Sequence, residues 1–207
     1  MWSTRYESDG LVLRAWEPGD GPALTAAKRA SYEHLKPWMP WAEADPDEVA
    51  EEKRVRLFAG KWLIGEDALV SLWTPDGTFL GGSGFHPRDG DYETRQAEIG
   101  MWIAGPAAGR GVGTRALRAM LRWGFGSWGF LRLSWICNSA NLGSRRVAEK
   151  AGMLLEGTRR GTYDDVTKGR RDELLFAALA SEWRDPEGLP LPEPVNPPYT
   201  GLPATGP

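Results

Sequence analysis

The 207-residue chain has very little of the chemistry that builds metal or redox centres, with one cysteine, Cys137, and two histidines. One cysteine cannot form an internal disulfide or a cysteine metal cluster, and two histidines are too few for most zinc sites. We therefore predict that the protein holds no metal. Cys137 is expected to be a small buried residue in a strand rather than a nucleophile, because no histidine lies near it in the sequence.

Long apolar runs are also missing. No stretch reaches the length of a membrane-spanning helix, and the first residues lack the hydrophobic segment of a signal peptide. The expected location is therefore the cytoplasm, with no membrane partner. A hydrophobic content of 41% over 207 residues predicts a globular domain with a sizeable core.

Acidic residues are absent from residues 99–147, although the chain has 28 Asp and Glu in all and a formal net charge of −3. That stretch holds seven of the 25 basic residues, which leaves 18 against all 28 acids elsewhere. Nucleic-acid binding asks for a broad basic face, so it is not expected. A local positive region instead predicts a small polyanionic ligand.

Residues 109–114, inside this acid-free stretch, read Gly-Arg-Gly-Val-Gly-Thr. Glycines let backbone N–H groups approach a phosphate, and a following helix turns its positive end toward them. A Walker A loop is excluded because Thr114-Arg115, and not Lys-Ser or Lys-Thr, follows the last glycine. A dinucleotide fingerprint needs an acid about 20 residues further on, where none exists. A plain turn between strand and helix remains an alternative.

Apolar spacing and turn residues predict alternating strands and helices over one domain. The domain is predicted to span residues 1–184, and the proline-rich remainder without periodicity, residues 185–207, forms a C-terminal arm. Strands are predicted at residues 11–15, 68–74, 79–85, 97–103, 131–137, 153–157 and 173–179, and helices at residues 21–34, 45–61, 115–123 and 144–151.

Three blocks, residues 97–103, 109–114 and 141–152, stand in the order found in the GNAT superfamily of acyl-CoA-dependent N-acyltransferases, and the chain resembles that family from about residue 11 to 179. Residues 34–41, 159–160 and 172–173 look like its RimJ/RimL branch, which acetylates ribosomal-protein N-termini and, in relatives, other amines. Ala108 departs from the family's Gln or Arg at that position. One side-chain contact to a pyrophosphate is therefore expected to be missing.

The resemblance implies an α+β fold, an α/β sandwich with a mixed, mostly antiparallel sheet of about seven strands flanked by helices. Its fourth and fifth strands would splay apart and admit the pantetheine arm of acetyl-CoA. Unpaired backbone groups there could bind the arm as another strand and stabilise the oxyanion of the reaction. The residues implied to bind the cofactor are Met101, Trp102, Ile103, Gly109, Arg110, Gly111, Val112, Gly113, Thr114, Asn141 and Ser144, with help from Arg115.

Glu98, one step before the splay, is the predicted catalytic base, since apolar neighbours could raise its pKa; a solvated or hydrogen-bonded strand glutamate is the alternative. Ser144 resembles the family residue near the thioester sulfur, and a helix-capping hydroxyl is equally compatible. Asn141 could bind the cofactor's amide arm or merely start a turn. Asp172 and Tyr163 are secondary candidates for proton transfer.

Trp38 and Trp41 lie in a proline-punctuated connection, where the family builds its acceptor wall, so they are predicted to bind the amine or, alternatively, to pin the loop. Nearby acids that could attract the amine are Glu33, Glu43, Asp45, Asp47 and Glu48. The predicted activity is direct acetyl transfer to a protein N-terminal α-amine. The alternatives are a small amine acceptor, such as an antibiotic or polyamine, and a non-catalytic acyl-CoA-binding module. A homodimer is also compatible with the sequence.

Overall fold

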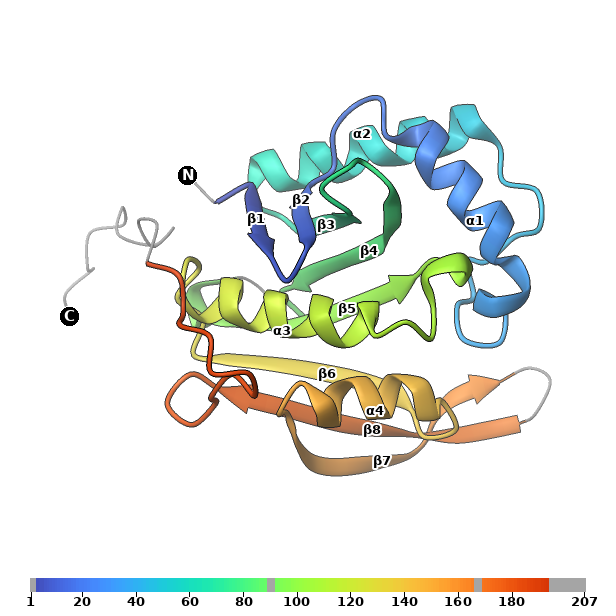
Figure 1. The fold of residues 1–207 in the computed structure, drawn as a ribbon. Coiled ribbons are helices and arrows are strands. Elements are labelled where there is room, and N and C mark those ends of the chain that lie inside the picture. Colours follow the sequence, from blue (N-terminus) through green and yellow to red (C-terminus); the bar gives the residue numbers. More distant parts are fainter. Residues whose placement is uncertain (1–2, 89–91, 166–168, 194–207) are drawn as a thin grey trace, which may run out of the picture.

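The computed structural model describes residues 3–88, 92–165 and 169–193, without the side chains of residues 163–165. In these residues one sheet has the strand order β1-β2-β3-β4-β5-β6-β8-β7, with only β5 and β6 parallel (Figure 1). The predicted α+β architecture is confirmed. The elements are β1 (Arg5–Ser8), β2 (Leu11–Ala15), α1 (Gly21–Leu35), α2 (Glu48–Ile64), β3 (Ala68–Trp73), β4 (Phe79–His86), η1 (Tyr92–Thr94), β5 (Gln96–Ile103), η2 (Gly105–Ala107), α3 (Val112–Phe125), β6 (Arg132–Asn138), α4 (Leu142–Lys150), β7 (Leu154–Asp165) and β8 (Gly169–Leu179).

Local sequence explains where the elements begin and end. The Asp47 side chain accepts a hydrogen bond from the Ala50 N–H at 2.8 Å and starts α2, which ends at Gly65 in the left-handed conformation. Gly77, with φ of 87°, closes the turn between β3 and β4. The predicted helices and hairpin therefore form for the expected reasons.

Two helical layers cover the sheet. α3 and α4 pack on one face, where the largest core gathers around the fully buried Trp123 and Phe85. α1 and α2 cover the other face, with a smaller cluster of Trp16, Leu24 and Val55 (Figure 1). Burying one such aromatic side chain stabilises the fold by about 1.5–3 kcal/mol.

Three details differ from the sequence prediction. The sheet gains an eighth strand, β1, which is too short and exposed to show an apolar pattern apart from Tyr6, whose ring stacks on Trp123 at 5.9 Å. α3 begins earlier, at Val112, directly after the glycine turn. β7 and β8 are longer than predicted because the described side chains of their outer part, residues 158–162 and 169–172, are mostly exposed, and the sequence there carries charged residues without apolar alternation.

β5 and β6 separate as predicted. They pair at three positions, Gln96 with Arg132, Ala97 with Leu133 and Glu98 with Ser134, and then diverge. These are the fourth and fifth strands of the sequence prediction, since β1 was not counted there. The remainder of β5, residues 99–103, thus has a sheet partner only on the β4 side.

The first part of the proline-rich arm lies on the domain itself. The Asp185 carboxylate forms a buried ion pair with Arg122 of α3, and Glu187 pairs with Arg118 one turn earlier. Pro192 lies against Gly126, where a Cβ atom would collide with it. Residues 185–193 therefore continue the packing of α3, and residues 194–207 lie outside the described part.

In the described part of the chain, no helix is long and apolar enough to cross a membrane. No three His, Cys, Asp or Glu side chains of these same residues gather into a group that could hold a metal ion.

Candidate active site

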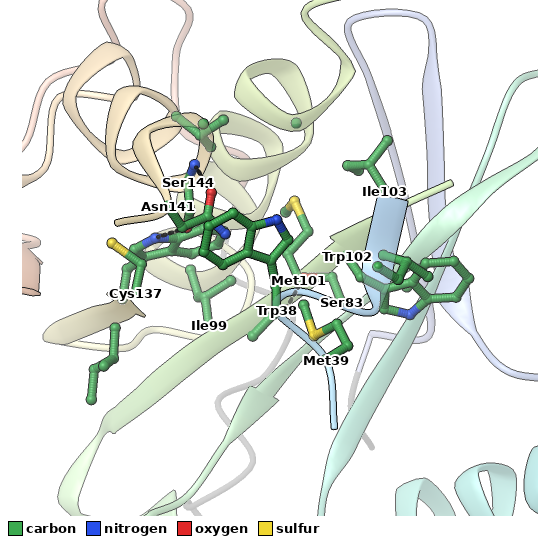
Figure 2. Close-up of a pocket in the computed structure, with 18 of the residues that line it drawn as sticks. Trp38, Met39, Ser83, Ile99, Met101, Trp102, Ile103, Cys137, Asn141 and Ser144 are labelled. Atoms are coloured by element: carbon green, nitrogen blue, oxygen red, sulfur yellow. Dashed lines mark hydrogen bonds between the residues drawn. The ribbon is translucent and has the colours of Figure 1, made fainter. Parts of the chain in front are cut away.

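A cavity of about 1070 Å³ opens where β5 and β6 separate, at the upper end of the size range of ligand sites. It is lined from both helical layers and from the loops that follow α1 and β5 (Figure 2). The predicted site residues that it brings together are Trp38, Trp41, Glu98, Met101, Trp102, Ile103, Gly109, Gly111, Gly113, Thr114, Asn141 and Ser144. Arg110 is exposed outside the lining, and Val112 is buried in the core.

The backbone of β5 presents alternate residues to the gap. The Gly100 carbonyl accepts a hydrogen bond from Ser83 Oγ at 2.8 Å, and the Ala104 N–H donates to the Leu80 carbonyl at 2.8 Å, so even-numbered backbone groups face β4. The odd-numbered ones, of Ile99, Met101 and Ile103, therefore face the gap.

Trp102 differs from the prediction in this respect. Its carbonyl lies against Gly81 of β4, so its backbone cannot also bind a ligand arm in the gap. The Trp102 indole points toward the layer of α1 and α2, where it meets the Trp41 ring edge-on with the ring centroids 5.5 Å apart. Trp102 thus belongs to the wall shared with α1 and α2, and Ile99 takes its place along the gap.

The glycine turn before α3 has the geometry of an anion cradle. Gly109 and Gly111 adopt φ of 73° and 77°, and a Cβ atom at either position would meet nothing within 4 Å. Gly111 caps α3 without a side-chain hydrogen bond, so the first N–H groups of the helix have no capping side chain. At Gly113 the requirement for glycine comes from packing, because a Cβ atom there would lie 3.3 Å from the Val147 side chain of α4.

The arginines of the acid-free stretch mostly serve the structure, in contrast to the sequence prediction of a local positive field. Arg115 donates to the Asp9 carbonyl at 2.8 Å and holds the β1–β2 turn. Arg146 lines the cavity. Four others pair with acids: Arg118 with Glu187, Arg122 with Asp9 and Asp185, and Arg132 with Glu156 from other segments, and Arg145 with Glu149 one turn further along α4.

Asn141 and Ser144 form the start of α4 beside the gap (Figure 2). The Asn141 Oδ1 caps the helix by accepting from the Ser144 N–H at 3.0 Å, so Asn141 does start the turn, and Ser144 is not the cap. Ser144 Oγ accepts from the Trp135 indole at 3.1 Å, which leaves its O–H for another acceptor. Cys137 lies within hydrogen-bonding reach of this hydroxyl, and burial raises the pKa of its thiol.

Glu98 stands on the last paired rung of β5 and β6, where the strands separate. Its carboxylate, 17% exposed, accepts a hydrogen bond from Arg88 Nη2 at 3.0 Å. The surroundings are thus less apolar than the sequence suggested, because the carboxylate has a guanidinium partner.

His86, the last residue of β4, lines the same cavity and was missed by the sequence analysis. The Nδ1 atom of His86 lies 2.8 Å from Asp67 Oδ1. In the register of β4 and β5, His86 pairs directly with Glu98. A Cβ at Gly84 or Gly100 would come within 3 Å of its ring. The signal in the sequence was a glycine in each of two neighbouring strands, Gly84 in β4 and Gly100 in β5, since together they leave room for one ring on the sheet face.

The wall that α1 and α2 give the cavity, where the sequence predicts the amine to bind, has fewer unpaired acids than predicted. Lys28, 4% exposed, pairs with Glu43 at 2.8 Å and Glu51 at 2.6 Å, and its Nζ lies 5.7 Å from the Trp41 ring centre. This lysine holds the pKa of Glu43 below its usual range. Other acids are used locally as well: Glu33 pairs with Lys36, Asp45 pairs with Arg29, and Asp47 caps α2.

The Trp38 indole reaches from the loop after α1 into the cavity, toward the side of Asn141 and Ser144 (Figure 2). Asp172, by contrast, accepts from the Gly161 N–H at 2.9 Å and supports the β7–β8 hairpin. The side chain of Tyr163 lies outside the described residues.

Comparisons with known proteins agree with this geometry. A family model described as an acetyltransferase (GNAT) domain matches residues 10–154. "Putative ribosomal N-acetyltransferase YdaF" of Bacillus subtilis (strain 168) is 26% identical over 177 residues, 85% of this chain and 94% of that protein. Mycobacterium smegmatis RimJ, solved in complex with CoA-disulfide, is 25% identical with a TM-score of 0.70 and 83% of both chains covered. A crystal structure described as a probable acetyltransferase is 25% identical with a TM-score of 0.76, covering 86% of this chain and 98% of that one.

Proposed function

The chain belongs to the GNAT acetyltransferase family, and from this premise we propose that it transfers an acetyl group from acetyl-CoA to the α-amine of a protein N-terminus. The resemblance carried by residues 97–103, 109–114 and 141–152 is thereby confirmed, including its RimJ/RimL-like branch. The acetyl donor is supported by the CoA-disulfide bound to the RimJ structure, and the acceptor by the name of the Bacillus relative. We expect the protein to act in the cytoplasm, where ribosomal proteins are made.

One observation carries the proposal: the unpaired edge of β5 runs directly to a glycine turn at a helix N-terminus. Amides of a pantetheine arm would pair with the backbone groups of Ile99, Met101 and Ile103 as an additional strand does. The pyrophosphate would then lie at Gly109 and Gly111, against the N–H groups that begin α3. Arg146 would add a positive charge at the same end.

The proposed reaction is direct transfer within a ternary complex. The amine nitrogen attacks the thioester carbonyl carbon, the C–S bond breaks, and coenzyme A leaves as a thiolate while the nitrogen loses a proton. A backbone N–H facing the gap would stabilise the oxyanion, and the Ser144 hydroxyl would donate to the departing sulfur. That Glu98 takes the amine proton stays a prediction.

The acceptor would enter from the layer of α1 and α2. Trp38, Trp41 and Trp102 supply aromatic walls there, and the cavity has room for more than the donor's arm alone. Space of this size favours a peptide end over a very small amine.

A thiol-release assay with acetyl-CoA tests the function. Peptides with free N-termini should release coenzyme A and gain one acetyl group by mass, whereas the same peptides blocked at the N-terminus should not react. Small amines, including a polyamine and an aminoglycoside, form the comparison panel. Reaction with these alone would overturn the acceptor assignment, and tight acetyl-CoA binding without thiol release from any amine would indicate a binding module.

A further inference from the structure

We propose that His86 is a catalytic residue, which takes the proton of the acceptor amine at Nε2, and that Asp67 is the positioning residue that orients it. The proposal rests on the proposed function and assigns a chemical step within it. It begins from the pair His86 and Asp67, which lies outside the three sequence blocks that carry the family resemblance.

The placement of the imidazole is the first argument. In the register of β4 and β5, Gly84 pairs with Gly100 and His86 with Glu98, so all four lie on the face covered by α1 and α2. A Cβ at Gly84 or at Gly100 would lie 2.9 Å from His86 Nε2, so the ring lies over both glycines. Gly100 lies between Ile99 and Met101, whose backbone groups are proposed to hold the donor. His86 Nε2 therefore lies on the acceptor side of that edge.

The tautomer is the second argument. An ionised carboxylate only accepts hydrogen bonds, so Asp67 at 2.8 Å holds the hydrogen on Nδ1 and leaves a lone pair on Nε2. The same carboxylate stabilises the imidazolium once the proton has arrived. The side chains of His86 and Asp67 are 15% and 23% exposed, so the pair is largely shielded from water, and His86 lines the cavity.

Glu98 is the competing base, and its contacts favour another role. Its carboxylate is engaged by Arg88 at 3.0 Å, whereas Asp67 contacts His86 at Nδ1 and leaves the lone pair of Nε2 to accept a proton. The other titratable or charged groups that line this side of the cavity are Lys28, His34, Glu51 and Arg54 from the helices, and Lys28 and Arg54 both pair with Glu51. Glu98 would then attract the ammonium form of the amine.

The step balances without a further reactant. The ammonium that Glu98 attracts first gives one proton to bulk water, because only the neutral amine has a lone pair. As that nitrogen bonds to the carbonyl carbon, its second proton passes to His86 Nε2, and the C–S electron pair leaves with the sulfur. The imidazolium gives its proton to water after the products depart. Asp67 stays ionised throughout.

The test compares His86→Gln, Asp67→Asn and Glu98→Gln by the pH dependence of kcat/KM with an N-terminal peptide. The peptide α-amine itself gives one acidic step in this profile, and the catalytic base gives a second. We expect His86→Gln to lower kcat roughly 100-fold or more and to remove the second step, with acetyl-CoA affinity unchanged. Asp67→Asn should move the second step to lower pH, because the imidazolium loses its anionic partner. Glu98→Gln should keep both steps. A second step retained in His86→Gln, or lost in Glu98→Gln alone, would overturn the proposal.

A second measurement does not depend on turnover. The chain has only two histidines, so ¹⁵N-detected NMR of the imidazoles is simple, and His34→Gln assigns the signals. We expect the hydrogen of His86 on Nδ1 in the parent and a mixture of tautomers in Asp67→Asn. A hydrogen on Nε2 in the parent overturns the proposal even if the enzyme transfers acetyl groups. A parent that releases no thiol with any amine overturns the proposed function instead.

Discussion

The free edge of β5 and its face toward α1 and α2 offer different chemical groups to a ligand. Along the gap, β5 presents backbone groups and leads to the glycine turn, and three arginines of the acid-free stretch, Arg118, Arg122 and Arg132, pair with acids from elsewhere in the chain. On the sheet face toward α1 and α2, titratable side chains line the cavity, among them Glu98 of β5 and His86 of the neighbouring strand β4. Binding is thus expected to depend on main-chain conformation along the edge, and proton transfer on side-chain pairs on the face.

The difference teaches that a run of like charge in the sequence does not define a field in space. Arg122, for example, comes from the acid-free stretch, yet it is 1% exposed and bound to Asp9 and Asp185. Substitutions that separate structural from binding roles can break this comparison or sharpen it.

The largest effect is expected for Arg122→Ala. It leaves the buried Asp185 without a cation, which typically costs about 3–5 kcal/mol of unfolding free energy, while acetyl-CoA affinity of the folded protein should not change. Urea denaturation and calorimetry measure the two quantities. Arg118→Ala is the control on the same helix, since its partner Glu187 is 53% exposed and the loss should be near 1 kcal/mol. A loss of acetyl-CoA affinity without loss of stability would return these arginines to the binding site.

The next effect concerns Gly111→Asn. Asparagine tolerates the left-handed conformation at φ of 77°, but its side chain would stand where the pyrophosphate is proposed to lie, so acetyl-CoA affinity should fall about 100-fold. Gly77→Asn is the matched control, at φ of 87° in an open hairpin turn far along the chain. Both variants should melt at similar temperatures. Equal acetyl-CoA affinities in the two would contradict the cradle.

Glu98→Gln tests the other face, with an expected loss of about tenfold in kcat/KM, through a higher KM for the amine. The physical reason is that a neutral amide no longer attracts the ammonium. Arg88→Met should act in the opposite direction on that KM, because it removes the cation paired with Glu98. A 100- to 10,000-fold loss of kcat in Glu98→Gln would instead make Glu98 the base, as the sequence analysis predicted.

The sequence predicted the backbone part of the candidate site better than the side-chain part, for a physical reason. Gly109 and Gly111 need their conformation whatever surrounds them, so a contiguous motif reports them. The direction of the Trp102 backbone depends on the register of β5 with β4, which no local pattern encodes.

His86 and Asp67 are 19 residues apart and meet only because β3 and β4 pair. The strand β1 was missed because four half-exposed residues carry too little apolar signal. The hairpin of β7 and β8 was predicted too short because its outer part buries little. The fold class followed from the family resemblance and the individual strands and helices from apolar spacing, whereas side-chain constellations required the sheet.

The smallest effect is expected at the aromatic wall. Trp41→Ala should raise the KM of the amine about fivefold and leave that of acetyl-CoA within twofold, because the ring packs on Trp102 and faces the acceptor side. Added salt should change the amine KM only slightly, since Lys28 already neutralises Glu43 beside this ring. Trp38→Ala, from the same loop, is expected to behave alike. Trp73→Leu serves as the control, because that indole lies outside the main cavity and its loss should lower thermal stability without a selective change in either KM. Equal changes of both KM values in Trp41→Ala, or a lower melting temperature with neither KM altered, would mean that the ring only pins the loop after α1.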